Sequence, residues 1–179
     1  MAVTVRRATI ADAGEITGLH IRSWQEGYRH VIPADFLAGL DREVTERTLR
    51  RQTRLLAAES EALFDLVAER DGEIAGWLAG GGSRDEGDDT ASVGEVYACY
   101  VDPSHWRHGV GTALMAAALD RLAADGYREA ILWVLDDNQR ARSFYERHGW
   151  ANDGGKKPFE VAGTEIPEVR YRRPLPATA

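Results

Sequence analysis

The feature that most constrains the fold of this chain is a strand followed at once by a glycine-bearing loop and a helix. Residues 93–101 predict a strand, and residues 111–124 predict a helix that Gly126 closes in the left-handed conformation. Gly109 and Gly111 stand where this helix begins. A strand joined to a helix in this way has to pack within a layered structure, which predicts an α/β domain.

The rest of the chain supplies further elements around this unit. Strands are predicted at residues 3–7, 63–69, 73–78 and 131–135, near Trp150 and at 168–172. Helices are predicted from Ala13 to about Tyr28, at 33–40, from Asp41 onward with Val44, Leu49 and Leu56 as apolar positions, and at 138–148. Asp71-Gly72, between two of the strands, is typical of a two-residue hairpin turn.

Length and composition fit a single domain over residues 1–179. With 44% hydrophobic residues the chain can bury a core without disulfides, and its single cysteine, Cys99, suits the reducing cytoplasm, where we expect the protein to reside. The longest apolar run, residues 113–119, is far shorter than the roughly 20 residues that span a membrane, so no membrane partner is expected. Residues 80–92 combine glycine with acidic residues and predict a mobile loop, and residues 174–179 predict a tail.

The charge balance narrows the classes of partner. Lys and Arg number 22 against 29 Asp and Glu, a net charge of −7. Nucleic acid is therefore not expected as a partner, because affinity for phosphate backbones comes largely from clustered basic residues. An acidic field mildly favours cationic substrates such as amines, although many of these carboxylates serve only to keep the protein in solution.

The loop between Val101 and Thr112 is suited to bind an anion. Helix N-termini carry unpaired N–H groups, and Gly109 and Gly111 let an oxygen approach the backbone without a Cβ in the way. It is neither a dinucleotide fingerprint, which needs a third glycine where Leu114 stands, nor a Walker A loop, which needs a lysine. The alternative is a tight turn at a helix start with no ligand.

A wider pattern surrounds this loop. Glu95-Val-Tyr-Ala-Cys-Tyr-Val101 precedes it, Arg107-His-Gly-Val-Gly-Thr112 forms it, and Asn138, Ala141, Tyr145-Glu146 and Gly149-Trp150 follow after a further strand. Together these motifs resemble the GNAT superfamily of acetyl-CoA-dependent N-acetyltransferases. Trp106 departs from the signature, which usually has Gln or Arg at this position.

The resemblance implies the architecture and the cofactor. It implies a mixed, mostly antiparallel sheet of about seven strands with helices on both faces, in which the fourth and fifth strands splay apart. The pyrophosphate of acetyl-CoA would lie on the amides of Arg107, His108, Gly109, Val110, Gly111 and Thr112, and the pantetheine arm would pair with Tyr100 and Val101. Asn138 would bind the pantetheine or cap its helix, and on that helix Ala141 and Tyr145 share its face.

The residues also suggest a chemistry for acetyl transfer. An alkyl ammonium with a pKa of about 10.4 is almost fully protonated at pH 7, so a base helps the amine to attack. Glu95 stands where several GNAT members carry a glutamate base; otherwise it is a surface strand residue. Tyr145 matches the usual acid that protonates the departing thiolate; otherwise it is a core aromatic. The main-chain N–H of Val101 is the candidate donor to the developing negative charge.

The resemblance implies that the first two helices wall the acceptor site, and three residues on the first helix are candidates for it. Trp24, Glu26 and Tyr28 would form an aromatic and acidic pocket for a cationic amine, or Trp24 and Tyr28 are core residues and Glu26 is exposed. No metal site is expected, because the spacing of Cys99, His105 and His108 matches no common zinc pattern.

The sequence therefore predicts an N-acetyltransferase that moves acetyl from acetyl-CoA directly to a primary amine of a small molecule or peptide. The alternatives are a non-catalytic module that senses acyl-CoA and a structural or partner-binding protein. Homodimers are common in the superfamily, and no long exposed apolar stripe demands one here.

Overall fold

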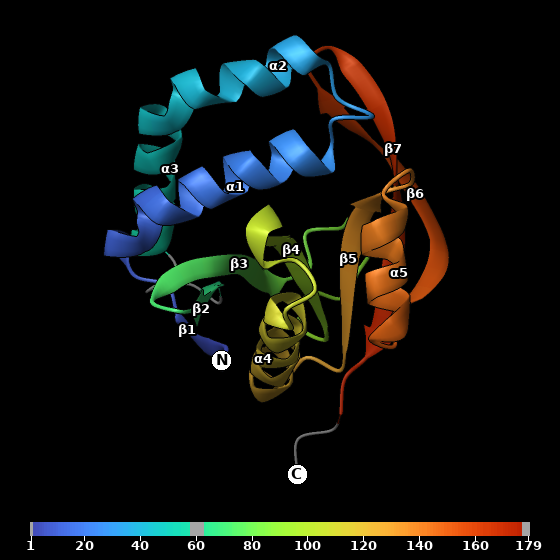
Figure 1. Ribbon diagram of the computed structural model, residues 1–179. Coiled ribbons are helices and arrows are strands. Elements are labelled where there is room, and N and C mark those ends of the chain that lie inside the picture. Colours follow the sequence, from blue (N-terminus) through green and yellow to red (C-terminus); the bar gives the residue numbers. More distant parts are fainter. Residues whose placement is uncertain (1, 58–62, 177–179) are drawn as a thin grey trace.

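A single seven-stranded sheet organises the chain in the computed structural model, which describes residues 2–57 and 63–176 (Figure 1). The strands are β1 (Thr4–Arg7), β2 (Phe64–Arg70), β3 (Glu73–Gly82), β4 (Val93–Val101), β5 (Glu129–Leu135), β6 (Ala151–Val161) and β7 (Thr164–Pro174). The helices are α1 (Ala13–Gly27), α2 (Ala34–Gly39), α3 (Val44–Ala57), α4 (Val110–Ala124) and α5 (Gln139–Arg147), with short 3₁₀ turns η1 (Ile10–Asp12), η2 (Leu40–Glu43) and η3 (Pro103–His105).

The sheet has the order β1-β2-β3-β4-β5-β7-β6, and its strands pair antiparallel except for β4 and β5, which are parallel. The parallel pair needs a crossover, and α4 supplies it between the two strands. The predicted fold class is therefore confirmed.

Helices cover both faces of this sheet (Figure 1). Leu114, Met115 and Leu122 of α4 lie in one core cluster with side chains of β2, β4 and β5. A second cluster, on the other face, joins α1 to β2 and β3 through Ile16 and Leu19. A Cβ at Gly76 would lie 2.8 Å from Leu114, so a glycine in β3 allows α4 to approach the sheet closely.

The helix α3 turns a different face to the core from the one that its sequence suggested. Val44, Leu49 and Leu56 were expected to be its apolar positions, but they are 38%, 58% and 55% exposed. Leu55, one position along from Leu56, is buried. That prediction is wrong. In a helix with few apolar and many charged residues, more than one set of apolar positions can form the face that packs on the core.

Both β-hairpins extend further than their sequences suggested. Asp71 and Gly72 have φ angles of 59° and 86°, as a type I′ turn requires, which confirms the predicted hairpin of β2 and β3. The strand β3 continues past Leu78 to Gly82, and β6 and β7 pair over most of their length where only short strands were expected. Their far end packs on α2 through Val161 and Ile166, which lie in one apolar cluster with Leu37.

The strand β6 forms one edge of the sheet. Its register against β7 shifts between Asn152 and Lys156, and Lys156, Lys157 and Pro158 follow in the outer strand. These features differ from the regular alternation that predicts a strand, which explains why the sequence indicated only a short one.

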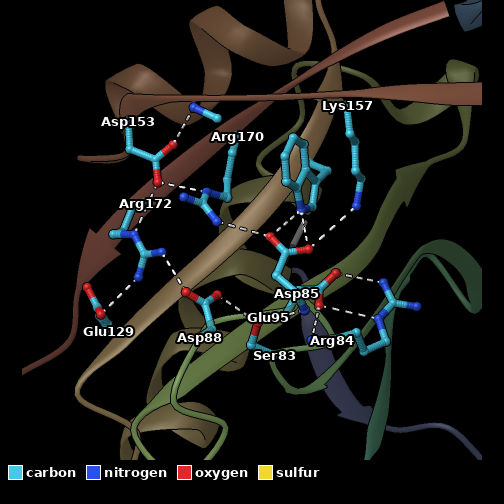
Figure 2. Close-up of polar contacts among 12 residues, drawn as sticks. Ser83, Arg84, Asp85, Asp88, Glu95, Glu129, Asp153, Lys157, Arg170 and Arg172 are labelled. Atoms are coloured by element: carbon cyan, nitrogen blue, oxygen red, sulfur yellow. Dashed lines mark hydrogen bonds and ion pairs between the residues drawn. The ribbon is translucent and has the colours of Figure 1, made fainter.

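The acidic loop after β3 is tied to the sheet by ion pairs (Figure 2). Asp85 pairs with Arg170 at 3.2 Å and accepts a hydrogen bond from Trp133 Nε1 at 2.9 Å. Asp88 pairs with Arg172 at 3.0 Å, and Asp153 of β6 bridges both arginines. The mobility expected for residues 80–92 stays a prediction, although the first three of these residues lie in β3.

The chain end expected as a tail is partly built into the fold. Pro174 ends β7, and Leu175 is buried, with its N–H donating to the carbonyl oxygen of Arg128 at 2.8 Å. Residues 177–179 lie outside the described residues. Among the helices of the described ranges, none is long and apolar enough to cross a membrane.

Candidate active site

A cavity of about 530 Å³ opens where β4 and β5 part. The two strands pair only from Val93 opposite Glu129 to Val96 opposite Leu132, although β4 runs on to Val101 and β5 to Leu135. The facing edges of both strands beyond that point are therefore free of strand pairing, and both line the cavity. The strands predicted to splay do so.

A β-bulge in β4 lies at the parting point. On β3, Ala79 pairs with Ala98 and Gly80 pairs with Val96, so Tyr97 is the extra residue. A bulge adds bend and twist to its strand, which directs β4 away from β5.

The backbone of Val101 faces this cavity edge. Asp102 donates its N–H to Ala75 of β3 at 2.9 Å, and successive residues of a strand turn their backbone groups to opposite edges. The groups of Val101 therefore point away from β3. Its carbonyl oxygen accepts hydrogen bonds from Trp106 Nε1 at 2.8 Å and from Ser23 Oγ at 3.1 Å, which leaves its N–H toward the gap between the strands.

The glycine loop places unbonded amides at one end of the cavity. Gly109 is the N-cap of α4 and has a φ of 81°, a left-handed conformation that favours glycine, and Arg107 has a φ of 65°. Ala113 donates to Gly109, so the N–H groups from Gly109 to Thr112 precede the first intrahelical bond. These amides and the helix dipole point at the same place, and that place suits an anion.

Basic side chains line the cavity although the protein carries a net negative charge. Arg107, Arg140 and Arg147 line the cavity together with Thr112 and His148, whose side chains lie 3.1 Å apart. The side chain of His108 is exposed and does not line the cavity, so only its main-chain amide remains a candidate donor.

Trp106 holds the loop in place. Besides its bond to Val101, its ring lies under the guanidinium of Arg140, 3.4 Å from the ring centroid. A tryptophan thus joins the loop, β4 and α5, and sequence reasoning had treated it only as a departure from a signature.

The helix α5 forms one wall. Asn138 caps it by accepting a hydrogen bond from the N–H of Ala141 at 3.1 Å, and Asn138, Ala141 and Tyr145 all line the cavity. Tyr145 is only 8% exposed, and burial raises the pKa of its phenol well above 10. Phe144, the neighbour of Tyr145, is half-buried and lines the cavity as well.

The other end of the cavity is aromatic. Trp24 of α1 lines it with Tyr28, the residue that follows α1, and with Tyr100 of β4 and Phe159 of β6. The ring of Trp24 lies edge to face with Tyr28 at 5.3 Å. Glu26 does not line the cavity, and pairs instead with Arg29 at 3.2 Å.

Glu95 is buried but lies outside the cavity lining. It is 2% exposed, and Arg84 holds it: the Arg84 main-chain N–H donates to Oε2 at 2.8 Å, and Arg84 Nη2 donates to Oε1 at 2.6 Å (Figure 2). Burial acts to lower the pKa of Arg84, but its hydrogen bond to Glu95 and the charge of Glu95 outweigh this and raise it.

One acid in the cavity was missed. Glu168 of β7 is, within residues 2–57 and 63–176, the only carboxylate that lines it. Its position follows from the pairing of β7 with β5, which sets Glu168 opposite Leu135 at the open end of β5. The sequence had marked Glu168 only as the start of a strand, and the signal that could have found it is a charged residue in a strand next to β5.

Comparison with known proteins agrees with this arrangement. The family model described as "Acetyltransferase (GNAT) family" matches residues 23–150. The "Uncharacterized N-acetyltransferase YuaI" of Bacillus subtilis (strain 168) is 29% identical over 169 residues, which are 93% of this chain and 90% of that protein.

Two further similarities are more limited: the first covers only part of the relative, and the second has a low sequence identity. The mycothiol acetyltransferase of Sanguibacter keddieii is 41% identical over 132 residues, but the match covers 72% of this chain and only 38% of that relative. The crystal structure of PaiA N-acetyltransferase from Thermoplasma acidophilum in complex with coenzyme A has a TM-score of 0.74 and covers 98% of this chain and 100% of that one. At 18% identity this is a likeness of fold.

Proposed function

The chain belongs to the GNAT acetyltransferase family and is an acyltransferase, and on that basis we propose that it moves the acetyl group of acetyl-CoA directly to a primary amine of a small molecule or peptide. The observation that carries the proposal is the two-ended cavity between β4 and β5. The loop amides and Arg107 lie at one end, and aromatic rings with one carboxylate lie at the other. Arg140 lies between the two, over the Trp106 ring and close to Gly27.

The basic end fits the pyrophosphate of acetyl-CoA. The amides from Arg107 to Thr112 would hold its oxygens, and a Cβ placed on Gly109 meets no atom within 4 Å, so the space in front of the loop is open. The unpaired edge of β4 at Tyr100 and Val101 would take the pantetheine arm as an added strand. Asn138 and Ala141 would face that arm from α5.

The side chains of the cavity favour direct transfer. Acetyl-CoA supplies the acetyl group as a thioester. Cys99 lines the cavity, but burial raises the pKa of its thiol to about 12, so it stays protonated and is a poor nucleophile. Because its pKa is raised, Tyr145 stays protonated at neutral pH, and it would give this proton to the departing thiolate. The N–H of Val101 would donate to the oxygen on which negative charge develops.

The geometry of the site gives little support to Glu95 as the base. Its carboxylate accepts three hydrogen bonds from Arg84 and lies outside the cavity lining. We therefore propose that Glu95 positions β4 and the loop after β3. The alternative of a non-catalytic acyl-CoA sensor accounts for the basic end, but gives no use to the buried phenol of Tyr145.

Binding of acetyl-CoA provides the first test. At a free concentration of 100 times Kd, acetyl-CoA should stabilise the protein by about 2.7 kcal/mol and raise its Tm by about 5–10 °C. Gly109→Glu should abolish this shift, because it places a charge and bulk against the phosphates. Gly126→Glu is the matched control: Gly126 also has a positive φ and open space around it, but lies at the other end of α4.

Turnover provides the second test. Wild-type protein incubated with acetyl-CoA and a panel of primary amines should release CoA thiol in proportion to acetylated product. Binding without thiol release for any amine would favour the sensor. No Tm shift at millimolar acetyl-CoA would contradict the proposal as a whole.

A further inference from the structure

The carboxylate of Glu168 stands free in the wall of the cavity. Glu168 lies opposite Leu135 of β5 and opposite Lys157 of β6, and paired residues of antiparallel strands direct their side chains to the same face. Within the part of the chain that the structure describes, no hydrogen bond or ion pair engages its oxygens. The carboxylate is therefore available to a ligand.

Aromatic rings share the cavity with this carboxylate. Trp24 lies edge to face with Tyr28 at 5.3 Å and with Phe159 at 6.1 Å, and Tyr100 lines the same space. Ring faces attract a cation, and a carboxylate forms charge-assisted hydrogen bonds with an ammonium. The combination suits a compact primary ammonium on an apolar stem.

Charged and titratable groups face Glu168 from each neighbouring element. Burial is the largest influence and raises the pKa of its carboxyl. Lys157 of β6 and Arg84 act to lower this pKa, while Glu95 of β4 and Asp85 act to raise it. Tyr28, which follows α1, and Tyr100 of β4 also interact with its charge. A carboxyl with a raised pKa is a better proton acceptor from an amine than an ordinary glutamate is.

The ammonium of Lys157, which lies opposite Glu168 in β6, is paired with another carboxylate. Lys157 Nζ lies 3.7 Å from Asp85 and 4.0 Å from the centre of the Trp133 ring, and Figure 2 shows it directed toward Asp85. Asp85 in turn is held by Arg170. Lys157 is therefore held by Asp85 and Trp133, and it influences Glu168 only through its charge.

Building on the proposed function, we infer that Glu168 binds the ammonium of the acceptor and takes the proton from its nitrogen. One N–H bond breaks as Glu168 is protonated, and the freed lone pair attacks the thioester carbonyl carbon. The C–N bond forms as the C–S bond breaks, and Tyr145 protonates the departing sulfur. The second proton lost from nitrogen replaces the one that Tyr145 gave, and Glu168 returns its own proton to solvent.

The test compares Glu168→Gln with Glu165→Gln. Both variants change a glutamate of β7 to glutamine, but Glu165 is exposed and does not line the cavity. The probes are phenethylamine, tyramine and butylamine, with thiol release measured from about pH 6.5 to 9.5. Melting curves and acetyl-CoA binding are recorded for each protein.

Glu168→Gln should lower kcat/KM by about 10²-fold or more at pH 7, with acetyl-CoA affinity unchanged. The variant depends on amine that is already neutral, and this fraction rises about tenfold with each pH unit below the amine pKa. The ratio of kcat/KM in wild type to that in Glu168→Gln should therefore shrink by about tenfold for each unit that the pH rises. Glu165→Gln should match wild type. Unchanged kcat/KM in Glu168→Gln, or a ratio that is constant with pH, would overturn the inference.

A second variant keeps the inference testable if Glu168→Gln folds poorly. Lys157→Gln removes a charge that lowers the pKa of Glu168, so the acidic limb of the wild-type kcat/KM profile should move to higher pH. Lys156→Gln, on the same strand and exposed, should not move it. A limb that stays in place in Lys157→Gln would contradict the role of Glu168.

The outcomes separate the two proposals. If wild type binds no acetyl-CoA, the proposed function fails. If it binds acetyl-CoA but acetylates none of the three amines, the acceptor class inferred from Glu168 fails. If it acetylates them and Glu168→Gln is equally active, only the role of Glu168 fails.

Discussion

Trp106 Nε1 donates a hydrogen bond of 2.8 Å to the carbonyl oxygen of Val101, which joins the glycine loop to the end of the strand before it. The same oxygen accepts a bond from Ser23 of α1. The carbonyl is thereby occupied within the protein, while the N–H of Val101 remains toward the cavity. The indole therefore sets the position of both the anion-binding loop and the strand edge.

Loss of this bond should weaken acetyl-CoA binding. Trp106→Phe keeps a ring for Arg140 to cover but removes the N–H, and a single hydrogen bond is worth about 0.5–1.5 kcal/mol. We expect Kd for acetyl-CoA to rise about 2- to 10-fold, measured by calorimetry. Trp150→Phe, which alters a buried indole outside the cavity lining, should lower Tm and leave Kd unchanged. An unaltered Kd in Trp106→Phe would show that the loop holds its shape without this bond.

Tyr145→Phe separates proton donation from packing. The variant keeps the ring in the core cluster and removes the hydroxyl, so turnover should fall by about 10²-fold with little change in acetyl-CoA affinity. The measurement is thiol release at saturating acetyl-CoA. Tyr127→Phe, outside the cavity lining, is the control. Equal turnover of Tyr145→Phe and wild type would make Tyr145 a packing residue only.

Glu95→Gln should act on stability more than on the pH dependence of turnover. The substitution weakens charge-assisted bonds from Arg84 to a buried group, which should lower the free energy of unfolding by about 1–3 kcal/mol in urea titrations. Arg84→Gln should cost a similar amount, and the double variant should cost less than the sum of the two. The ratio of kcat/KM to wild type should stay constant across about pH 6.5 to 9.5. A ratio that narrows toward high pH would return the role of base to Glu95.

Asp12 should stabilise the fold only while it is ionised. Its hydrogen bonds from Arg6, chief among the causes, lower the pKa of the carboxyl from 3.8 to about 2. Because the folded value lies below the unfolded one, the stabilisation is present above about pH 4 and is lost as pH falls through about 2. Asp12→Asn should cost about 1–2 kcal/mol at pH 7, since Arg6 is partly exposed.

Urea titrations of Asp12→Asn and wild type at pH 7, 4.5 and 2.5 check this expectation. The gap between the two proteins should be clearly smaller at pH 2.5 than at pH 7, because the stabilisation is partly lost between the unfolded pKa of 3.8 and the folded pKa of about 2. The exposed Asp35→Asn should follow wild type throughout. If the two proteins differed in their free energy of unfolding by the same amount at every pH, the side chain of Asp12 would act through its packing and not through its charge.

Local chemistry explains what the sequence could predict. Gly109 takes a left-handed φ, Asp71-Gly72 forms the turn expected of that dipeptide, and Asn138 caps α5, because each outcome depends on a few neighbouring residues. The parting of β4 and β5 was predicted by resemblance. The position of its bulge at Tyr97 was not, because a bulge depends on how two strands align.

The acidic residues show where sequence reasoning stops. The structure gives three glutamates different environments: Glu26 lies in an exposed ion pair, Glu95 is a buried carboxylate paired with the exposed Arg84, and Glu168 is a free carboxylate in the cavity. That outcome depends on the register of β7 against β5 and on the reach of Arg84 from a loop. Neither is encoded by the spacing of residues along one element.

The outer strand β6 has a consequence for the protein at high concentration. As the last strand of the sheet it turns one row of backbone groups outward, where a strand of another molecule could pair. Such a strand would meet the cations of Lys156 and Lys157, a missing donor at Pro158 and a ladder bent by the register shift. Sheet extension from molecule to molecule, the first step toward fibrous aggregates, is therefore disfavoured at this edge.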